Sequence, residues 1–258
     1  LYHRTLNVGR VVSPTLSLLV QREAEIHAFQ PESFFTVKLD ADGVSAVSEK
    51  FQAMSEANAV AEACKDEQVI VKTIKQTDKS EKAPALYDLT TLQRDANRTL
   101  GFTAQQTLDY LQSLYEKKLC TYPRTDSRFL TDDMEGTVPQ TVSFAASVCG
   151  KEMPTVYAGQ VCNSKKVSDH HAILPTGSAK SQDLSALPAG EREILTLVCR
   201  QVLMAVSAPH FYRETEVTLD CGDHTFTAKG KTVLDDGWKA YAAPGKRDTI
   251  LPELTEGQ

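Results

Sequence analysis

The 258-residue sequence has few of the features that would assign it to a class at once. Its longest apolar run, Leu16-Ser17-Leu18-Leu19-Val20, is far too short to cross a bilayer, and no charged-then-apolar signal pattern opens the chain. We therefore expect an intracellular, cytoplasmic protein that does not enter the membrane. A phosphate-binding loop of the Gly-x-x-x-x-Gly-Lys type is also missing, so nothing predicts nucleotide hydrolysis.

Cysteine pairs and a basic excess are missing as well. The six cysteines form no Cys-x-x-Cys pair and no zinc-finger spacing, so we expect reduced, buried thiols. The net charge of −6 counts against a simple nucleic-acid coat protein, because phosphate binding normally shows as a basic excess. Between Leu89 and Leu130, however, six basic residues face four acidic ones, which permits a local basic surface.

Composition otherwise fits a globular chain. Hydrophobic residues make up 41% and charged residues 24%, which is the balance of a domain with a sizeable core. The chain opens at Leu1 without an initiator methionine and ends in a polar run, so we expect a piece of a longer polypeptide.

The first third of the sequence predicts one helix followed by strands. Ser13 as N-cap and Pro14 at the first helical position predict a helix that ends near Phe29. Residues 34–40 and 69–74 alternate like strands, Asp42-Gly43 is a hairpin signal, and 55–65 is a short helix. Residues 31–82 therefore indicate a small β-rich unit.

The middle of the sequence predicts helices. A helix from Asp88 to a C-terminal cap at Gly101 precedes a second helix, which opens on a capping box at Thr103 and runs to Leu119. The pair is a helix-turn-helix candidate, although many αα-hairpins without a DNA role look the same.

The last part of the sequence predicts a return to strands. Four prolines predict an irregular stretch over 131–190, and a helix follows from Glu191 to about Ser207. Strands are then expected at 214–219 and 225–229 around a turn at 221–224.

These patterns predict a mixed α and β multidomain chain. Residues 1–30 form a helical segment, and 31–82 with 212–258 form a discontinuous β-rich domain. The inserted helical domain, 83–211, contains the helix-turn-helix core and carries Tyr122.

Tyr122 and Arg124 are the candidate chemical groups. Pro123 pushes Tyr122 out of the α region, and in an extended segment Arg124 would project beside the phenol, roughly 7 Å away between Cα atoms. A phenol is a nucleophile for a phosphodiester, and a guanidinium can neutralise the phosphate oxygens. Since a free phenol has a pKa near 10, it needs help to lose its proton. The alternative is a surface turn in which Asp126 pairs with Arg124.

Four ordered segments resemble the signatures of type IA DNA topoisomerases, particularly the topoisomerase III branch. The first is the hexapeptide Tyr122-Pro123-Arg124-Thr125-Asp126-Ser127. The others are residues 6–16, 86–94 and 168–176, and the resemblance covers about residues 1–241. The family usually carries Gln at the position of Val12, which puts one polar contact in doubt.

The resemblance implies roles for particular residues. Tyr122 would become joined to a 5′ phosphate of a cut single strand, Arg124 would support the scissile phosphate, and His170 would assist at the backbone. Residues expected to contact DNA are Arg10, Gln93, Arg94, Thr125, Asp126 and Ser127. The β-rich domain would be an arch, residues 1–30 would belong to a DNA-groove domain, and the helix-turn-helix would be CAP-like.

No metal site is expected in this chain. Adjacent residues such as His170 and His171 diverge on a helix or strand, so they are poorly arranged to chelate one ion, and a structural hydrogen bond for one of them is favoured. Asp40-Ala41-Asp42 resembles the start of the family's acidic run, but Val44 breaks the run, and Asp42-Gly43 and Asp235-Asp236 are explained as turns. By the resemblance, Mg²⁺ would be held by a missing N-terminal domain of the same polypeptide.

The function implied is ATP-independent breakage, passage and rejoining of single-stranded DNA through a 5′-phosphotyrosyl intermediate, relaxing negative supercoils or decatenating DNA. This chain alone would not complete the cycle. Expected partners are single-stranded DNA, the missing domain and, as a further candidate, a helicase, on the nucleoid or a plasmid. The rivals are a tyrosine recombinase, disfavoured by the immediate Tyr-Pro-Arg spacing, a non-enzymatic helix-turn-helix module, and a purely structural piece.

Overall fold

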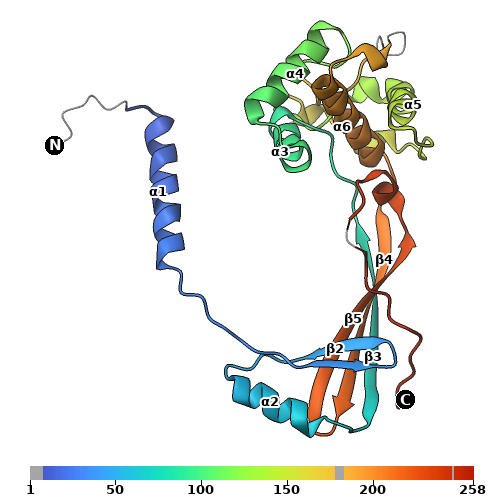
Figure 1. The fold of residues 1–258 in the computed structure, drawn as a ribbon. Coiled ribbons are helices and arrows are strands. Elements are labelled where there is room, and N and C mark those ends of the chain that lie inside the picture. The colour runs from blue at the N-terminus through green and yellow to red at the C-terminus, as the bar shows by residue number, and fades with distance from the viewer. Residues whose placement is uncertain (1–7, 178–182, 246) are drawn as a thin grey trace, which may run out of the picture. The chain divides into compact units, whose positions relative to one another are not determined.

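The computed structural model describes residues 8–177, 183–245 and 247–258, and it shows the predicted mixed α and β chain (Figure 1). The chain divides into two compact units. The first holds the chain up to Lys72 with Thr218–Ala228 and Gly257–Gln258, and the second holds Thr73–Val217 with Lys229–Glu256. The predicted domain boundaries stay predictions. No helix in the described residues combines the length and apolar character that crossing a bilayer requires.

Helix α1 spans Val12–Ala28, close to the predicted range, but its predicted cap is wrong. The helix begins before Ser13, and the Ser13 hydroxyl accepts a hydrogen bond from the Gly9 N–H at 3.2 Å. Pro14 therefore lies in the first turn, where its missing N–H costs nothing. No residue of α1 is buried, and Leu16, Leu18 and Leu19 are all exposed.

A β-hairpin and a short helix follow in the first unit. Strand β1 (Lys38–Ala41) pairs antiparallel with β2 (Val44–Ser48), with Lys38 opposite Val47. Asp42 and Gly43 both have positive φ, 45° and 81°, which confirms the predicted turn. The predicted strand over 34–40 is too long, because only Phe35 bridges to Phe51 before β1. Helix α2 (Met54–Ala63) buries Ala57 and Val60.

Five strands form one sheet in the order β1-β2-β5-β4-β3. Strand β3 (Val69–Glu81) is longer than predicted, and β4 (His210–Cys221) and β5 (His224–Asp235) join through the predicted turn, where Gly222 has a φ of 55°. Strand β2 pairs antiparallel with β5. Each of β3, β4 and β5 contributes residues to both units.

Two predicted capping patterns are confirmed in the second unit. Helix α3 (Leu89–Leu100) has Asp88 as N-cap, and Gly101 ends it with a φ of 73°. Helix α4 (Ala104–Glu116) opens on the Thr103 capping box. It ends before the predicted Leu119, because Lys118 takes a φ of 59° and turns the chain. The tight turn and the contact between α3 and α4 give the expected αα-hairpin.

The stretch predicted to be irregular contains a helix, so that prediction is wrong. Helix α5 spans Val138–Cys149, with Pro139 in its first turn, where proline is tolerated rather than disruptive. Among the other described residues of the stretch, loops connect four short 3-10 helices, η1 (Asp132–Thr137), η2 (Ala158–Gln160), η3 (Ser164–Lys166) and η5 (Leu184–Ala186).

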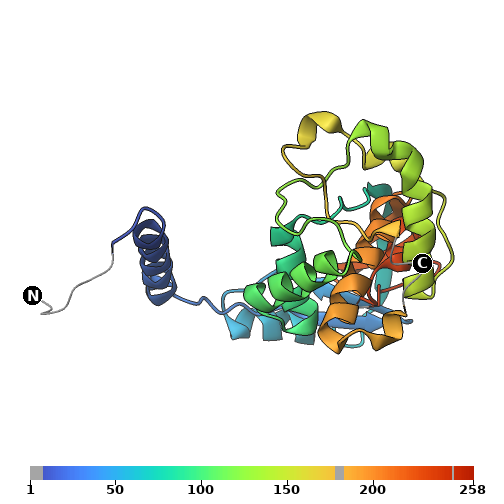
Figure 2. The same cartoon turned by 90° about the horizontal axis from the view of Figure 1, so that it is seen from above.

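Helix α6 (Ala189–Ala205) forms the centre of the second unit's core. It contacts α3, α4 and α5, and Figures 1 and 2 both show it lying beside α4 and α5. Its fully buried residues include Ile194, Leu195 and Val198, which join Leu92 and Leu111 in one apolar cluster. The 3-10 helix η6 (Gly237–Tyr241) follows β5 and also packs on α6.

Candidate active site

The segment that carries Tyr122 alternates between buried and exposed residues. Pro123, Thr125 and Ser127 are buried, whereas Arg124 and Asp126 are exposed and Tyr122 is half-buried. This alternation is what an extended backbone produces, because successive side chains point to opposite sides. The phenol of Tyr122 and the guanidinium of Arg124 therefore belong to the less buried side, as predicted.

Backbone hydrogen bonds fix this segment against two other predicted motifs. The Thr121 N–H donates to Leu174 O at 2.9 Å, and the Thr121 hydroxyl accepts from the Leu174 N–H at the same distance. At the start of α3, the Leu89 N–H donates to Thr125 O at 3.2 Å, and Ile173 N–H donates to Tyr87 O at 2.9 Å. The segments 86–94, 122–127 and 168–176 therefore meet in one place.

Two aromatic rings lie against the Tyr122 ring. His170 lies 4.3 Å away between ring centroids with an interplanar angle of 39°, and Tyr115 lies 5.5 Å away in an edge-on arrangement. Thr125 fixes the backbone of His170, because its buried hydroxyl donates to His170 O at 2.9 Å. The predicted pair of Tyr122 and His170 is thus in direct contact, although the residues are 48 positions apart in the sequence.

Arg124 does not form the ion pair that the surface-turn alternative requires. The carboxylate of Asp126 instead accepts a hydrogen bond from the Ser168 hydroxyl at 2.8 Å. Within the described residues, the Arg124 guanidinium makes no hydrogen bond and no ion pair. An exposed, uncommitted guanidinium two residues from a phenol can receive a phosphate group.

Thr125 and Ser127 use their hydroxyls inside the protein. Besides its bond to His170, Thr125 Oγ1 accepts from the Ser127 N–H at 3.1 Å. Ser127 Oγ donates to Lys166 O at 2.9 Å and accepts from the Phe129 N–H at 3.1 Å. These bonds fix the conformation of residues 122–127, which we call the tyrosine loop. A contact of either hydroxyl with DNA stays a prediction.

The remaining predicted DNA contacts are more dispersed. Gln93 donates its amide to Ala104 O at 2.9 Å and so ties α3 to the start of α4. Arg94 is exposed on α3, and Arg10 is exposed in the turn before α1, in the other unit. His171 has the predicted structural role, because its Nδ1 lies 2.7 Å from Ala172 O. For Arg10, Gln93 and Arg94, DNA contact stays a prediction.

Metal-ligating side chains do not gather in the described part of the chain, where no three His, Cys, Asp or Glu residues could hold one ion. Asp40 pairs with Lys38 at 2.9 Å, and Asp42 lies in the β1–β2 turn. Asp235 accepts from the Gly237 N–H at 2.9 Å, which fits its predicted place in a turn. The described residues therefore show no cluster that could hold Mg²⁺, and where the ion is bound stays a prediction.

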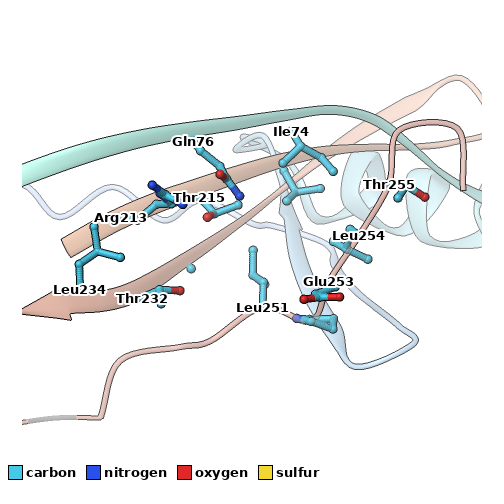
Figure 3. A pocket seen from close by; sticks show the side chains of 13 residues that line it. Ile74, Gln76, Arg213, Thr215, Thr232, Leu234, Leu251, Glu253, Leu254 and Thr255 are labelled. Carbon is cyan, nitrogen blue, oxygen red and sulfur yellow. The ribbon is translucent and has the colours of Figure 1, made fainter.

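A groove elsewhere in the second unit does not include Tyr122 in its lining. It has a volume of about 400 Å³ and lies between β3, β4, β5 and the segment 251–255 (Figure 3). Its lining includes Arg213, which is ion-paired with Asp78 at 2.6 Å, and Glu253. Its lining as described includes neither a tyrosine nor an unpaired cation, so it is a poor candidate for the predicted phosphodiester chemistry.

Sequence reasoning missed several residues around the tyrosine. Tyr115 lies in the helix predicted to run to Leu119 and Ser168 in the segment 168–176, but neither residue is predicted to lie at the site. Arg128 donates from Nε to Leu86 O at 3.0 Å and from Nη2 to Ala85 O at 3.3 Å, joining the tyrosine loop to the segment before α3. No local pattern marks these residues. The contacts of Ser168 and Arg128 join parts of the chain 42 positions apart, and the contact of Tyr115 with Tyr122 depends on the turn that follows α4.

Comparisons with known proteins agree with this geometry. The family model described as DNA topoisomerase matches residues 1–258. DNA topoisomerase 3 of Bacillus subtilis is 38% identical over 280 residues, covering 99% of this chain and 38% of its own length. DNA topoisomerase 3 of Staphylococcus saprophyticus is 34% identical over 268 residues, covering 99% of this chain and 37% of its own length. The chain thus spans less than two-fifths of these relatives.

A solved structure is also similar. Full-length topoisomerase I from Thermotoga maritima superposes with a TM-score of 0.76 at 26% identity, covering 99% of this chain and 43% of that one. Because the family model matches the whole sequence and the fold agrees, the four sequence motifs are not a chance combination. The chain belongs to the DNA topoisomerase family.

Proposed function

We propose that this chain supplies the nucleophile of a type IA DNA topoisomerase, with Tyr122 attacking single-stranded DNA. The observation that carries the proposal is the contact of the Tyr122 ring with His170, two residues along the chain from the exposed Arg124, whose guanidinium has no partner among the described residues. Family membership supplies the reaction class, and topoisomerases are isomerases. The arch, the strand gate and the DNA-binding role of the helix-turn-helix belong to this proposal.

In the proposed step, Tyr122 Oη attacks the phosphorus of a backbone phosphodiester. A bond from Oη to phosphorus forms as the bond to the 3′ oxygen breaks, which leaves a 5′-phosphotyrosyl link and a free 3′ hydroxyl. The phenol proton must leave, and the free strand end must gain one. Arg124 would neutralise the non-bridging oxygens, and His170 would orient the phenol or contact the backbone. Rejoining reverses these changes, so no ATP is consumed.

We place the Mg²⁺ site in a part of the polypeptide outside this chain, because the described residues offer no such site and the relatives are more than twice as long. The ion would assist cleavage and rejoining there, and this chain alone would bind DNA without turning over. The proposed location is the bacterial cytoplasm, at the nucleoid or a plasmid, and a helicase is a further candidate partner. DNA contacts by Arg10, Gln93, Arg94, Thr125, Asp126 and Ser127 belong to the same proposal.

The test is formation of a covalent adduct. The chain is mixed with the parts of Bacillus subtilis DNA topoisomerase 3 outside the matched region, Mg²⁺ and a labelled single-stranded oligonucleotide. We expect a 5′-phosphotyrosyl adduct that Tyr122→Phe abolishes. Tyr157→Phe is the matched control, because it removes a phenol hydroxyl from an exposed tyrosine outside the site. Arg124→Ala should slow adduct formation by about 10²–10³-fold, as for loss of one donor to a transition-state oxyanion.

Other outcomes would favour the rival functions. Salt-sensitive DNA binding without any adduct would leave a non-enzymatic helix-turn-helix module. An adduct that survives Tyr122→Phe would contradict the assigned nucleophile. The absence of both binding and adduct would leave a structural role.

A further inference from the structure

A cluster of cations lies in the second unit, outside the segment 122–127. A pocket of about 410 Å³ is lined by α3, α6, η6 and the segment before α3. Its charged and aromatic lining consists of Arg94, Arg98, Arg128, Arg200, Asp95, Tyr87 and Trp238. We call this feature the arginine pocket.

Helical spacing explains why these side chains converge. Thr91, Arg94, Asp95 and Arg98 repeat at intervals of three and four residues, so they share one face of α3. Arg200 lies on the facing side of α6 between Leu197 and Met204, at the same intervals. Two helices therefore present cations to one space.

The single carboxylate in the pocket is already engaged. Asp95 accepts from the Tyr87 hydroxyl at 2.8 Å and from Arg98 Nη2 at 2.9 Å. Arg94 and Arg200, by contrast, make no hydrogen bond or ion pair with any residue that the structure describes. Four guanidinium groups against one carboxylate leave a net charge of +3 on the lining.

Trp238 gives the pocket an aromatic wall. Its indole Nε1 donates to Glu81 O at 3.1 Å, which fixes the ring, and Lys239 Nζ lies 5.4 Å from the ring centroid. Lys239 is itself paired with Glu81 at 2.5 Å, so its charge is largely compensated. An aromatic ring next to unpaired guanidinium groups matches the way proteins bind single-stranded nucleic acid, where the phosphates meet cations and the bases stack.

We propose that the arginine pocket binds a phosphodiester of single-stranded nucleic acid through Arg94 and Arg200, with the adjoining base against Trp238. The proposal rests on the proposed function only in taking nucleic acid as the ligand. The N-terminus of α3 is bonded to Thr125, and Arg98 lies roughly 13 Å further along the helix axis. A strand that reaches both Tyr122 and the pocket would therefore follow α3.

The experiment measures non-covalent binding of a labelled oligothymidine to the 258-residue chain across a salt series, without Mg²⁺ or other topoisomerase parts. Each lost phosphate contact should reduce the slope of log affinity against log salt by roughly 0.7. We expect Arg94→Ala with Arg200→Ala to lower the slope accordingly and to weaken binding at low salt by about tenfold or more. Arg192→Ala is the matched control, because it removes an exposed cation from α6 outside the pocket.

A second measurement locates the strand on the wild-type chain, so it does not depend on the folding of a variant. An oligonucleotide containing 5-iodouridine is photo-crosslinked, and the modified peptide is identified by mass spectrometry. We expect crosslinks at Trp238 that unlabelled oligonucleotide removes and an equal charge of pyrophosphate does not. Removal by pyrophosphate alone would overturn the nucleic-acid assignment in favour of a free phosphate site.

Crosslinks found only elsewhere, or an unchanged salt slope in the folded double variant, would overturn the arginine pocket. If circular dichroism shows that the alanine variant is unfolded, the variant Arg94→Lys with Arg200→Lys replaces it. Because lysine keeps the two charges, the slope of log affinity against log salt should then equal that of the wild-type chain. Because no step requires an adduct at Tyr122, failure here is distinguishable from failure of the proposed topoisomerase reaction.

Discussion

At the scale of single residues, Thr125 does more for the candidate site than its small side chain suggests. One hydroxyl joins the tyrosine loop to His170 O and also accepts the Ser127 N–H. Ser127 is buried whereas His170 is exposed, so removal of the hydroxyl would leave the Ser127 N–H without a partner and would release the His170 backbone. Thr125 is therefore a positioning residue for the His170 ring that lies on Tyr122.

Thr125→Val tests this role. The variant keeps the shape of the side chain but loses both hydrogen bonds, so we expect the free energy of unfolding to fall by about 1–3 kcal/mol. Urea unfolding followed by Trp238 fluorescence gives the measurement. Thr99→Val is the control, because its exposed hydroxyl bonds only to Asp95 O within α3, and it should stay within about 0.5 kcal/mol. Equal losses in the two variants would contradict the role of Thr125.

Among the elements, the junction between β5 and η6 is held by one glycine. Gly237 has a φ of 49°, and a Cβ there would overlap the Pro209 carbonyl oxygen and lie 2.6 Å from Ala208 O. The backbone of η6 approaches this closely because the Trp238 N–H donates to Ala208 O at 2.9 Å. The glycine thus allows η6, and with it Trp238, to lie against the end of α6.

Gly237→Ala should destabilise the chain by more than the conformational cost alone. A positive φ costs a non-glycine residue about 1 kcal/mol, and the clash with fixed backbone adds to it. Gly101→Ala is the matched control, since its φ is 73° but no atom lies within 4 Å of an added Cβ. Thermal melts of both variants give the comparison, and a smaller loss for Gly237→Ala than for Gly101→Ala would refute the close-approach argument.

Local patterns predicted the elements better than they predicted the contacts. The helix caps at Asp88, Gly101 and Thr103 involve only residues within one turn of the same helix. They can therefore be inferred from the neighbouring residues in the sequence. The same reasoning failed at Pro139, because a proline in a first turn and a proline that breaks a helix look alike in sequence.

Contacts within the candidate site divide in the same way. The hexapeptide alone marks Tyr122 and Arg124 as candidate site residues. The hydrogen bond from Ser168 to Asp126, by contrast, spans 42 positions and depends on how the loops fold together. The arginine pocket is a further case, since Arg200 reaches Arg94 only through the packing of α6 near α3.

For the whole molecule, the six thiols offer a measure of native packing. Cys120, Cys199 and Cys221 are buried, and the other three are partly exposed. Burial raises the pKa of Cys120 to about 12, and burial with a hydrogen bond to Cys221 raises the pKa of Cys64 to about 11. Cys64 and Cys221 are neighbours although they lie 157 positions apart in the sequence, which cysteine spacing could not reveal.

Alkylation of the thiols should follow this packing. Because the thiolate is the reactive form, a raised pKa leaves less of it at pH 8, roughly a hundredfold less for Cys64 than for a free cysteine. Labelling of Cys64 should therefore accelerate as the pH rises toward 11. Mass spectrometry of labelled peptides should find Cys120 and Cys199 unreacted in the native chain and all six labelled in denaturant. Rapid native labelling of Cys120 would contradict the core as described.

The exposure of α1 has a consequence for how its amides behave. A 17-residue helix without tertiary packing sits close to its own helix–coil midpoint in water, because nucleation is unfavourable and each hydrogen bond adds little. We therefore expect the amides of α1 to exchange with solvent deuterium at rates near those of an unfolded segment, whereas α6, with ten buried residues, should open only with the core. Slowed exchange in α1 thus becomes a direct signal that another protein surface has docked on it.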